Sequence, residues 1–212
     1  MAPVSARPGA WAEMPVDEGP PRADGDGMVG SLAVTDLISR TMAILRVDGD
    51  RWQELATGLD RDLLLRRPSP GEWSALECLG HASDTEAAVF AARVRAMLAG
   101  QPSFPGFDPD RESTPITADT DPTALAERHA ALRTESLALL TTVTEVDLER
   151  TARHTELGPV TMRELLNEWA AHDLMHVVQA ERAVMQAFIP AAGPWRRYFA
   201  DHDVDAPARG PG

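Results

Sequence analysis

The residues in this sequence best suited to chemistry are its histidines, of which there are six among 212 residues. Two of them, His172 and His176, are four residues apart in a segment with helical periodicity. One helical turn would direct both imidazoles toward one point, as in helices that present two nitrogen ligands to a metal ion. The same spacing also occurs where a hydrogen-bonded core histidine lies beside a histidine at the rim of a helix.

The helical wheel of this segment favours the metal. Its apolar face comprises Met162, Leu165, Leu166, Trp169, Ala180, Ala183 and Val184. His176 lies within that face and His172 at its edge, so both rings would point inward. Buried polar groups without partners are costly, and a metal ion would give both rings one shared partner.

His81 is the third candidate ligand. It lies opposite the apolar stripe of its own helical segment, on a side with small residues: Cys78, Thr85, Ala88 and Ala92. A histidine among small side chains could line a cavity, although the same side could instead face solvent. Three imidazoles from two helices would leave a coordination position open, which is typical of catalytic sites. Nitrogen ligands of this kind suit Zn, Ni, Cu or Fe, and they do not suit Mg or Ca.

Three further residues are candidates for the cleft. Asp173 is three residues from His176 and could contact the free ring nitrogen, or it could form a buried ion pair with an arginine. Gln179, one turn past His176, could line the cleft. Cys78 could contact a substrate or be an inert core residue. The sequence identifies no catalytic acid or base, and we predict the other three histidines to be surface residues: His129, His154 and His202.

The elements that must position these residues are helices. Apolar periodicity and capping signals predict four long helices and a short C-terminal helix, over residues 35–57, 74–99, 122–143, 161–188 and 193–200. We therefore expect an all-α four-helix bundle with no strands, in which 147–160 forms a loop or a short extended piece. The connector 101–120 is long enough to run back along the second helix, which predicts an up-down-down-up order.

Composition excludes several classes of function. Acidic residues outnumber basic ones by 33 to 20, which gives a net charge of −13. This charge disfavours binding to nucleic acid or to anionic membrane surfaces. One cysteine excludes a disulfide framework, and no apolar run is long enough to span a bilayer, so we expect a cytoplasmic protein.

The ends of the chain differ in composition from the middle. Residues 1–30 are rich in Pro, Gly and acids and predict a disordered leader; one hypothesis is that the protein starts at Met28. We expect the helical metal-binding domain over 31–200 and a flexible tail over 201–212.

Three motifs together resemble the DinB-like (DinB/YfiT) metalloprotein superfamily. They are Pro70-Gly-Glu-Trp-Ser-Ala-Leu-Glu-Cys-Leu-Gly-His81, the stretch Gly158 to Gln179 that contains His172-Asp-Leu-Met-His176, and the terminal Gly193-Pro-Trp-Arg-Arg-Tyr198. The likeness covers about residues 31 to 200. It implies an up-down-down-up bundle, commonly dimeric, and one divalent metal, often zinc or nickel, held by His81, His172 and His176.

The resemblance also implies two kinds of activity on a small molecule. One is transfer or isomerisation with a low-molecular-weight thiol such as mycothiol or bacillithiol, and the other is metal-dependent hydrolysis. One of four arginines near the cleft could hold a carboxylated cosubstrate: Arg93, Arg95, Arg163 or Arg182. The alternatives are a non-catalytic, stress-associated metal-binding dimer and a purely structural helical dimer.

Overall fold

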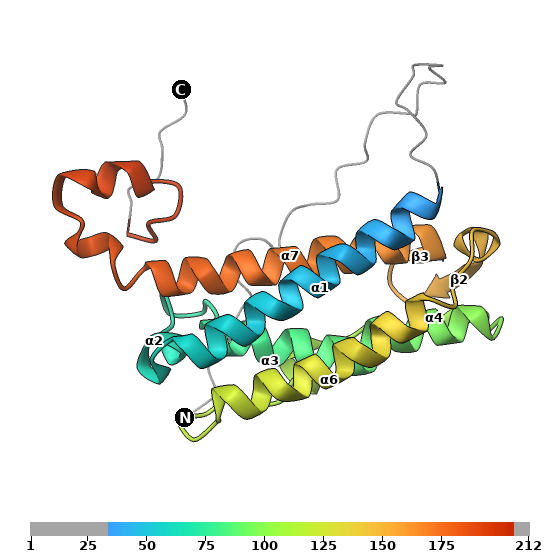
Figure 1. Ribbon diagram of the computed structural model, residues 1–212, viewed down its shortest axis with the longest axis horizontal. Coiled ribbons are helices and arrows are strands. Elements are labelled where there is room, and N and C mark those ends of the chain that lie inside the picture. The colour runs from blue at the N-terminus through green and yellow to red at the C-terminus, as the bar shows by residue number, and fades with distance from the viewer. Residues whose placement is uncertain (1–33, 206–212) are drawn as a thin grey trace, which may run out of the picture.

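Four helical rods dominate the computed structural model, which describes residues 34–205 (Figure 1). They are α1 (Val34–Gly58); α3 (Ala75–Thr85), continued by the π-helical turn η1 (Glu86–Phe90) and α4 (Ala91–Leu98); α6 (Pro122–Leu140); and α7 (Met162–Met185). Shorter helices are α2 (Arg61–Leu65), α5 (Pro109–Glu112), and the 3-10 turns η2 (Val146–Glu149), η3 (Ile189–Ala191) and η4 (Gly193–Phe199). The predicted helical fold is therefore correct in outline.

The rods are packed so that chain neighbours are not always spatial neighbours. α1 packs against α6 and α7, and α3 packs against the same two helices from the other side. Figure 1 shows α3–α4 and α6 running in one direction, and α1 and α7 running in the other. This arrangement places α3 and α7, which carry the candidate ligands, side by side.

Local sequence signals explain where the rods begin and end. The Ser74 hydroxyl accepts a hydrogen bond from Glu77 N, and Glu77 Oε2 accepts one from Ser74 N, which completes a capping box. Thr161 and Glu164 form the same motif at the start of α7. Gly100, with φ of +71°, follows α4 in a conformation that only glycine adopts readily.

The π-helical turn is a feature that the sequence did not predict. A π-bulge inserts about one extra residue into a helix and so rotates everything after it by about 100°. In this chain the insertion lies between His81 and α4. The insertion therefore determines which residues of α4 lie on the same face of the rod as His81.

A small sheet corrects the expectation of an all-α protein. β1 (Ser103–Phe104) pairs in parallel with β2 (Thr151–His154), and β2 pairs antiparallel with β3 (Gly158–Thr161). The strands have only two to four residues, too few for alternation to appear in the sequence. The short extended piece expected within 147–160 is the β2–β3 hairpin.

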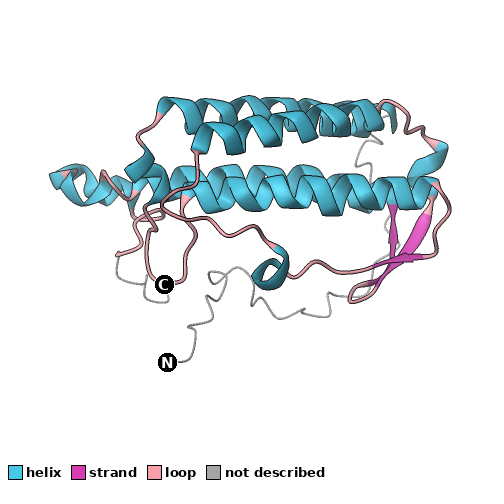
Figure 2. Cartoon of the chain, turned by 90° about the horizontal axis from the view of Figure 1, so that it is seen from below, coloured by secondary structure: helices cyan, strands magenta, loops and turns pink. Residues whose placement is uncertain are grey.

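The connector between α4 and α6 returns the chain to the start of α6 and also packs against α3. It runs along the outside of the bundle, with α5 part-way (Figure 2). Asp84 on α3 accepts hydrogen bonds from Thr114 N at 2.6 Å and from Thr114 Oγ1 at 3.0 Å. A Cβ atom on Gly80 would lie 2.9 Å from Ile116 Cδ1, so the connector touches the helix backbone there. The connector thus covers the side of α3 that carries His81.

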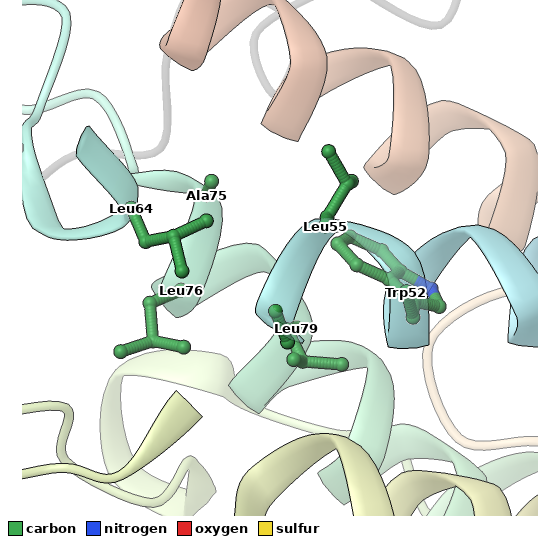
Figure 3. A pocket seen from close by; sticks show the side chains of 7 residues that line it. Trp52, Leu55, Leu64, Ala75, Leu76 and Leu79 are labelled. Carbon is green, nitrogen blue, oxygen red and sulfur yellow. The ribbon is translucent and has the colours of Figure 1, made fainter. Parts of the chain in front are cut away.

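The core divides into two apolar clusters along the bundle. One, which includes Trp169, Phe90 and Leu45, lies toward the sheet, and the other, which includes Trp52 and Leu79, lies toward α2. A small apolar pocket within the second cluster is shown in Figure 3. Its lining comprises Trp52, Leu55, Ala56, Leu64, Ala75, Leu76 and Leu79. This lining carries no titratable group, so the pocket is a packing feature.

The chain ends bear on two expectations. The leader expected over 1–30, and Met28 with it, lies outside the described residues. Within the expected tail, Val204 N donates to Oε1 of Gln186, the residue that follows α7, at 3.1 Å, and Asp203 pairs with Arg196 of η4. None of the helices between residues 34 and 205 is long and apolar enough to cross a membrane.

Candidate metal centre

The structure brings together the three histidines that the sequence singled out. His81 on α3 and His172 and His176 on α7 each offer a ring nitrogen, and these atoms all lie within 4.8 Å of one another. The Nε2 atom of His172 is 3.3 Å from that of His81 and 3.2 Å from that of His176. His81 and His176 are buried, and His172 is half-buried. The three rings converge through the same atom type.

This geometry fits a metal ion. Nitrogens about 2.0–2.1 Å from a tetrahedral zinc are separated by about 3.3–3.4 Å, and the two Nε2 separations here are 3.2 and 3.3 Å. A hydrogen-bonded trio without metal fits less well, because one proton on His172 Nε2 could serve only one of its two neighbours. Three nitrogen ligands leave at least one coordination position for another molecule.

Aromatic side chains enclose the cluster. The Trp73 ring centroid lies 4.9 Å from that of His81 and 5.7 Å from that of His176. Phe107 of the connector lies 5.9 Å from His81, and Phe90 lies 5.0 Å from His172. These rings cover much of the site, and His172 is the one ligand that is partly exposed.

Burial keeps the three imidazoles neutral. It lowers the pKa of His81 to about 3, that of His172 to about 2 and that of His176 to about 4, with mutual repulsion contributing at His81 and His172. At neutral pH each ring therefore keeps a lone pair for a metal, since only a deprotonated nitrogen can coordinate.

Gln179 orients one of the rings. Its Oε1 lies 3.0 Å from His176 Nδ1, which places the ring proton on Nδ1 and leaves Nε2 free to face the other two histidines. Gln179, expected beside the cleft, thus has a specific role: it selects the tautomer that His176 needs to coordinate a metal through Nε2.

We expect Gln179→Leu to lower zinc affinity by about 10–100-fold, because the ring of His176 loses the acceptor that fixes its orientation. Gln179→Glu keeps an acceptor at this position and should restore most of the affinity. Competition with a chromophoric chelator measures both variants. Equal affinity in Gln179→Leu and in the wild-type protein would contradict the role of Gln179.

Asp173 forms the alternative contact that we considered for it. Its carboxylate accepts hydrogen bonds from Arg133 Nη2 at 2.7 Å and Nη1 at 3.0 Å, both within the core. No hydrogen bond joins it to His176 in the described structure, because its side chain points toward α6. Its negative charge still raises the pKa of His176, so it acts on that ligand only through space.

Arg133 is the centre of a buried polar cluster. Besides Asp173 it contacts Glu86 Oε1 at 2.9 Å, the Leu45 carbonyl at 2.6 Å and His129 Nε2 at 3.3 Å. One guanidinium thus joins α1, η1, α6 and α7. Sequence spacing did not reveal this cluster, although an arginine on a helix whose neighbouring turns are buried is a signal for it.

Asp48 on α1 belongs to the same cluster, but its buried negative charge is stabilised by no hydrogen bond in the described structure. It is fully buried, and neither carboxyl oxygen accepts a hydrogen bond from the described residues. Desolvation, followed by repulsion from Asp173, raises its pKa to about 6. Arg51 Nη1, at 3.6 Å, offsets only part of this effect.

This pKa predicts a pH-dependent effect of Asp48→Asn. Because the folded pKa exceeds the unfolded one, the contribution of Asp48 to the free energy of unfolding falls as pH rises from about 4 through 6. The amide cannot ionise, so the variant should be more stable than the wild-type protein at pH 8 by about 1–3 kcal/mol and nearly equal to it at pH 4. Urea unfolding at both pH values measures this, and a difference independent of pH would refute it.

Two of the histidines predicted to be surface residues are buried. His129 is 1% exposed beside Arg133, and His154 is 6% exposed on β2; His202 alone is exposed as predicted. The reason is tertiary: α6 turns His129 into the polar cluster, and the hairpin turns His154 toward α4. Neither position can be recognised from ligand spacing.

Cys78 and Glu77 take no part in the site. Cys78 is fully buried in the apolar cluster toward α2, and burial raises the pKa of its thiol. Burial and the raised thiol pKa favour the second of the two roles considered for it, that of an inert core residue. Glu77 serves the capping box and accepts from Arg67 Nε at 2.9 Å.

Comparison with known proteins agrees with this architecture. The family model of the DinB superfamily matches residues 44–180, a segment that contains all three histidines. The chain belongs to the DinB superfamily. No curated protein matches this DinB protein in sequence.

Among solved structures, the DinB protein is similar in fold to YfiT from Bacillus subtilis, with a TM-score of 0.60 and 16% sequence identity. The match covers 81% of this chain and 95% of YfiT. YfiT is described as a probable metal-dependent hydrolase with an unusual four-helix bundle topology. At this identity the likeness establishes the fold alone.

Proposed function

We propose that this DinB protein is a metal-dependent enzyme acting on a small molecule, with one zinc or nickel ion held by His81, His172 and His176. The observation that carries the proposal is the convergence of three Nε2 atoms with separations of 3.2 and 3.3 Å at the half-exposed edge of a buried site. The up-down-down-up order of the rods is also part of the proposal. The packing of α3 against α7 brings the two ligand-bearing helices together.

The metal would act as a Lewis acid that polarises a substrate carbonyl and lowers the pKa of a coordinated water or thiol. The chain's own residues supply the surroundings. Gln179 holds His176 in the ligand tautomer, and Trp73 and Phe107 shield the rings from water. His172 is the only one of the three ligands that is partly exposed.

The proposal covers two reaction types, hydrolysis and S-transfer with a thiol cosubstrate such as mycothiol or bacillithiol. The buried Cys78 is no nucleophile, so in the second type the thiol must come from outside the chain. The description of YfiT as a probable metal-dependent hydrolase supports the first type.

Metal reconstitution tests the proposal. We expect the purified protein to bind close to one zinc or nickel ion per chain and to turn over esters, amides, or an electrophile with a thiol, only when metal is bound. His172→Ala is the matched control. Stoichiometric metal without turnover across such a panel would favour the non-catalytic metal-binding alternative, and absence of metal binding would leave only a structural role.

A further inference from the structure

Arg93 on α4 is a buried cation without a carboxylate partner. It is 7% exposed, and no Asp or Glu among residues 34–205 forms an ion pair with it. Glu168 and Glu156 affect it electrostatically, but both are exposed to solvent. Buried charges in proteins are ordinarily paired, because an ion that is removed from water loses its hydration.

The charges of the other three arginines expected near the cleft are compensated by a carboxylate or by water. Arg163 pairs with Glu149, and Arg182 pairs with Glu72 at 3.2 Å. Arg95 is exposed, so water compensates its charge. Among the four, Arg93 alone is both buried and without an anionic partner in the described part of the chain.

The neighbours of Arg93 supply too few acceptors. Its Nη2 donates to the Pro105 carbonyl at 3.1 Å, and the cation lies 5.0 Å from the centre of the Phe104 ring. Its remaining close polar contact is His154 Nε2, at 3.2 Å from the same Nη2 atom. The Nε and Nη1 groups donate to no residue between 34 and 205.

The hairpin decides the tautomer of His154. The backbone N–H groups of Glu156 and Leu157 both donate to His154 Nδ1, each at 3.2 Å. Nδ1 is therefore the acceptor, and the ring proton lies on Nε2. His154 Nε2–H and Arg93 Nη2–H are then two donors that face each other, and an acceptor shared by both would satisfy them.

This pair of donors lies on the His172 side of the metal centre, toward the sheet. At 3.6 residues per turn, Arg93 would be rotated by about 120° from His81, but the extra residue of the π-helical turn η1 reduces this to about 20°. Arg93 therefore lies on the same face of the rod as His81, about 18 Å further along its axis. Phe90, one turn before Arg93, lies 5.0 Å from His172, and the charge of Arg93 lowers the pKa of His172.

We propose that Arg93 and the Nε2–H group of His154 bind a carboxylate group of the substrate beside the three-histidine centre. A guanidinium and a carboxylate form short, charge-assisted hydrogen bonds, so the anion would compensate the buried cation and separate the two facing donors. The inference rests on the proposed function, and it narrows the substrate to a small molecule that carries a carboxylate away from its reacting group.

The binding test uses acetate as a probe and the full-length protein with and without zinc. We expect acetate to shift the side-chain ¹⁵N–¹H resonances of Arg93 and His154 saturably, compared with chloride at equal ionic strength, in both forms. Arg93→Met should weaken acetate binding at least about 10-fold, since the guanidinium charge and its paired N–H donors are lost. Arg95→Met, two residues along the same helix, is the matched control and should bind like the wild-type protein.

Further variants keep the test decisive if Arg93→Met does not fold. Arg93→Lys retains the positive charge but lacks the paired N–H donors of a guanidinium. His154→Phe retains an aromatic ring but lacks the N–H donor. Both variants should bind acetate more weakly than the wild-type protein. Wild-type affinity in both variants would overturn the proposal. So would equal loss in Arg93→Met and Arg95→Met, which would indicate an adventitious ion only.

A second measurement tests the position of the subsite. In protein loaded with paramagnetic cobalt(II), bound acetate should show enhanced proton relaxation that Arg93→Met abolishes. Relaxation that persists in Arg93→Met would place acetate on the metal itself and overturn the subsite. A protein that binds acetate through Arg93 but takes up no metal would refute the proposed function and leave the anion site standing.

Discussion

Replacement of His81, His172 or His176 by alanine is expected to lower zinc or nickel affinity by at least about 100-fold. Each imidazole supplies one of three converging nitrogens, and two nitrogens with an added water hold a metal far less tightly. Metal content after dialysis, together with chelator competition, measures the effect. Since the rings are neutral in the fold, far-ultraviolet circular dichroism of the variants should match that of the wild-type protein.

His202→Ala is the matched control, because His202 is exposed and outside the cluster. His129 is unsuitable for this purpose: it contacts Arg133 in the core, and its loss would affect stability. Retention of metal in all three ligand variants, at the level of His202→Ala, would show that the cluster does not bind the metal.

Arg133→Met is expected to have the largest effect on stability, a loss of about 3–5 kcal/mol in the free energy of unfolding. The substitution leaves the carboxylates of Asp173 and Glu86 buried without their counter-charge. Arg133→Lys keeps the charge but cannot bridge both carboxylates, so it should lose less. Urea unfolding monitored by circular dichroism measures both variants.

Arg128→Met provides the comparison on the same helix. Arg128 is partly exposed, and its partner Asp84 keeps the hydrogen bonds from Thr114, so we expect a loss of only about 1 kcal/mol or less. An equal loss in Arg128→Met and Arg133→Met would show that the Arg133 cluster contributes no more than a surface ion pair.

The helical part of the fold could be predicted because its signals are local. The capping boxes at Ser74 and Thr161, the proline that follows Asp121, and Gly100 each act within a few residues of themselves. The sheet could not be predicted, because β1 and β2 are almost fifty residues apart in sequence and too short to show a pattern.

The candidate site divides in the same way. His172 and His176 are neighbours because a helix repeats every 3.6 residues, so the sequence by itself determined that their rings converge. The sequence also determined the helical register that turns both rings inward. Joining His81 to them required the family resemblance as well as the spacing.

Only the tertiary structure decided what depends on contacts between distant segments. It placed the connector over the face of α3 that carries His81, paired Asp173 with Arg133, and buried His129 and His154. It also left Arg93 without a carboxylate. Burial and pairing follow from which helices pack together, and the free energy of that packing is summed over the whole chain.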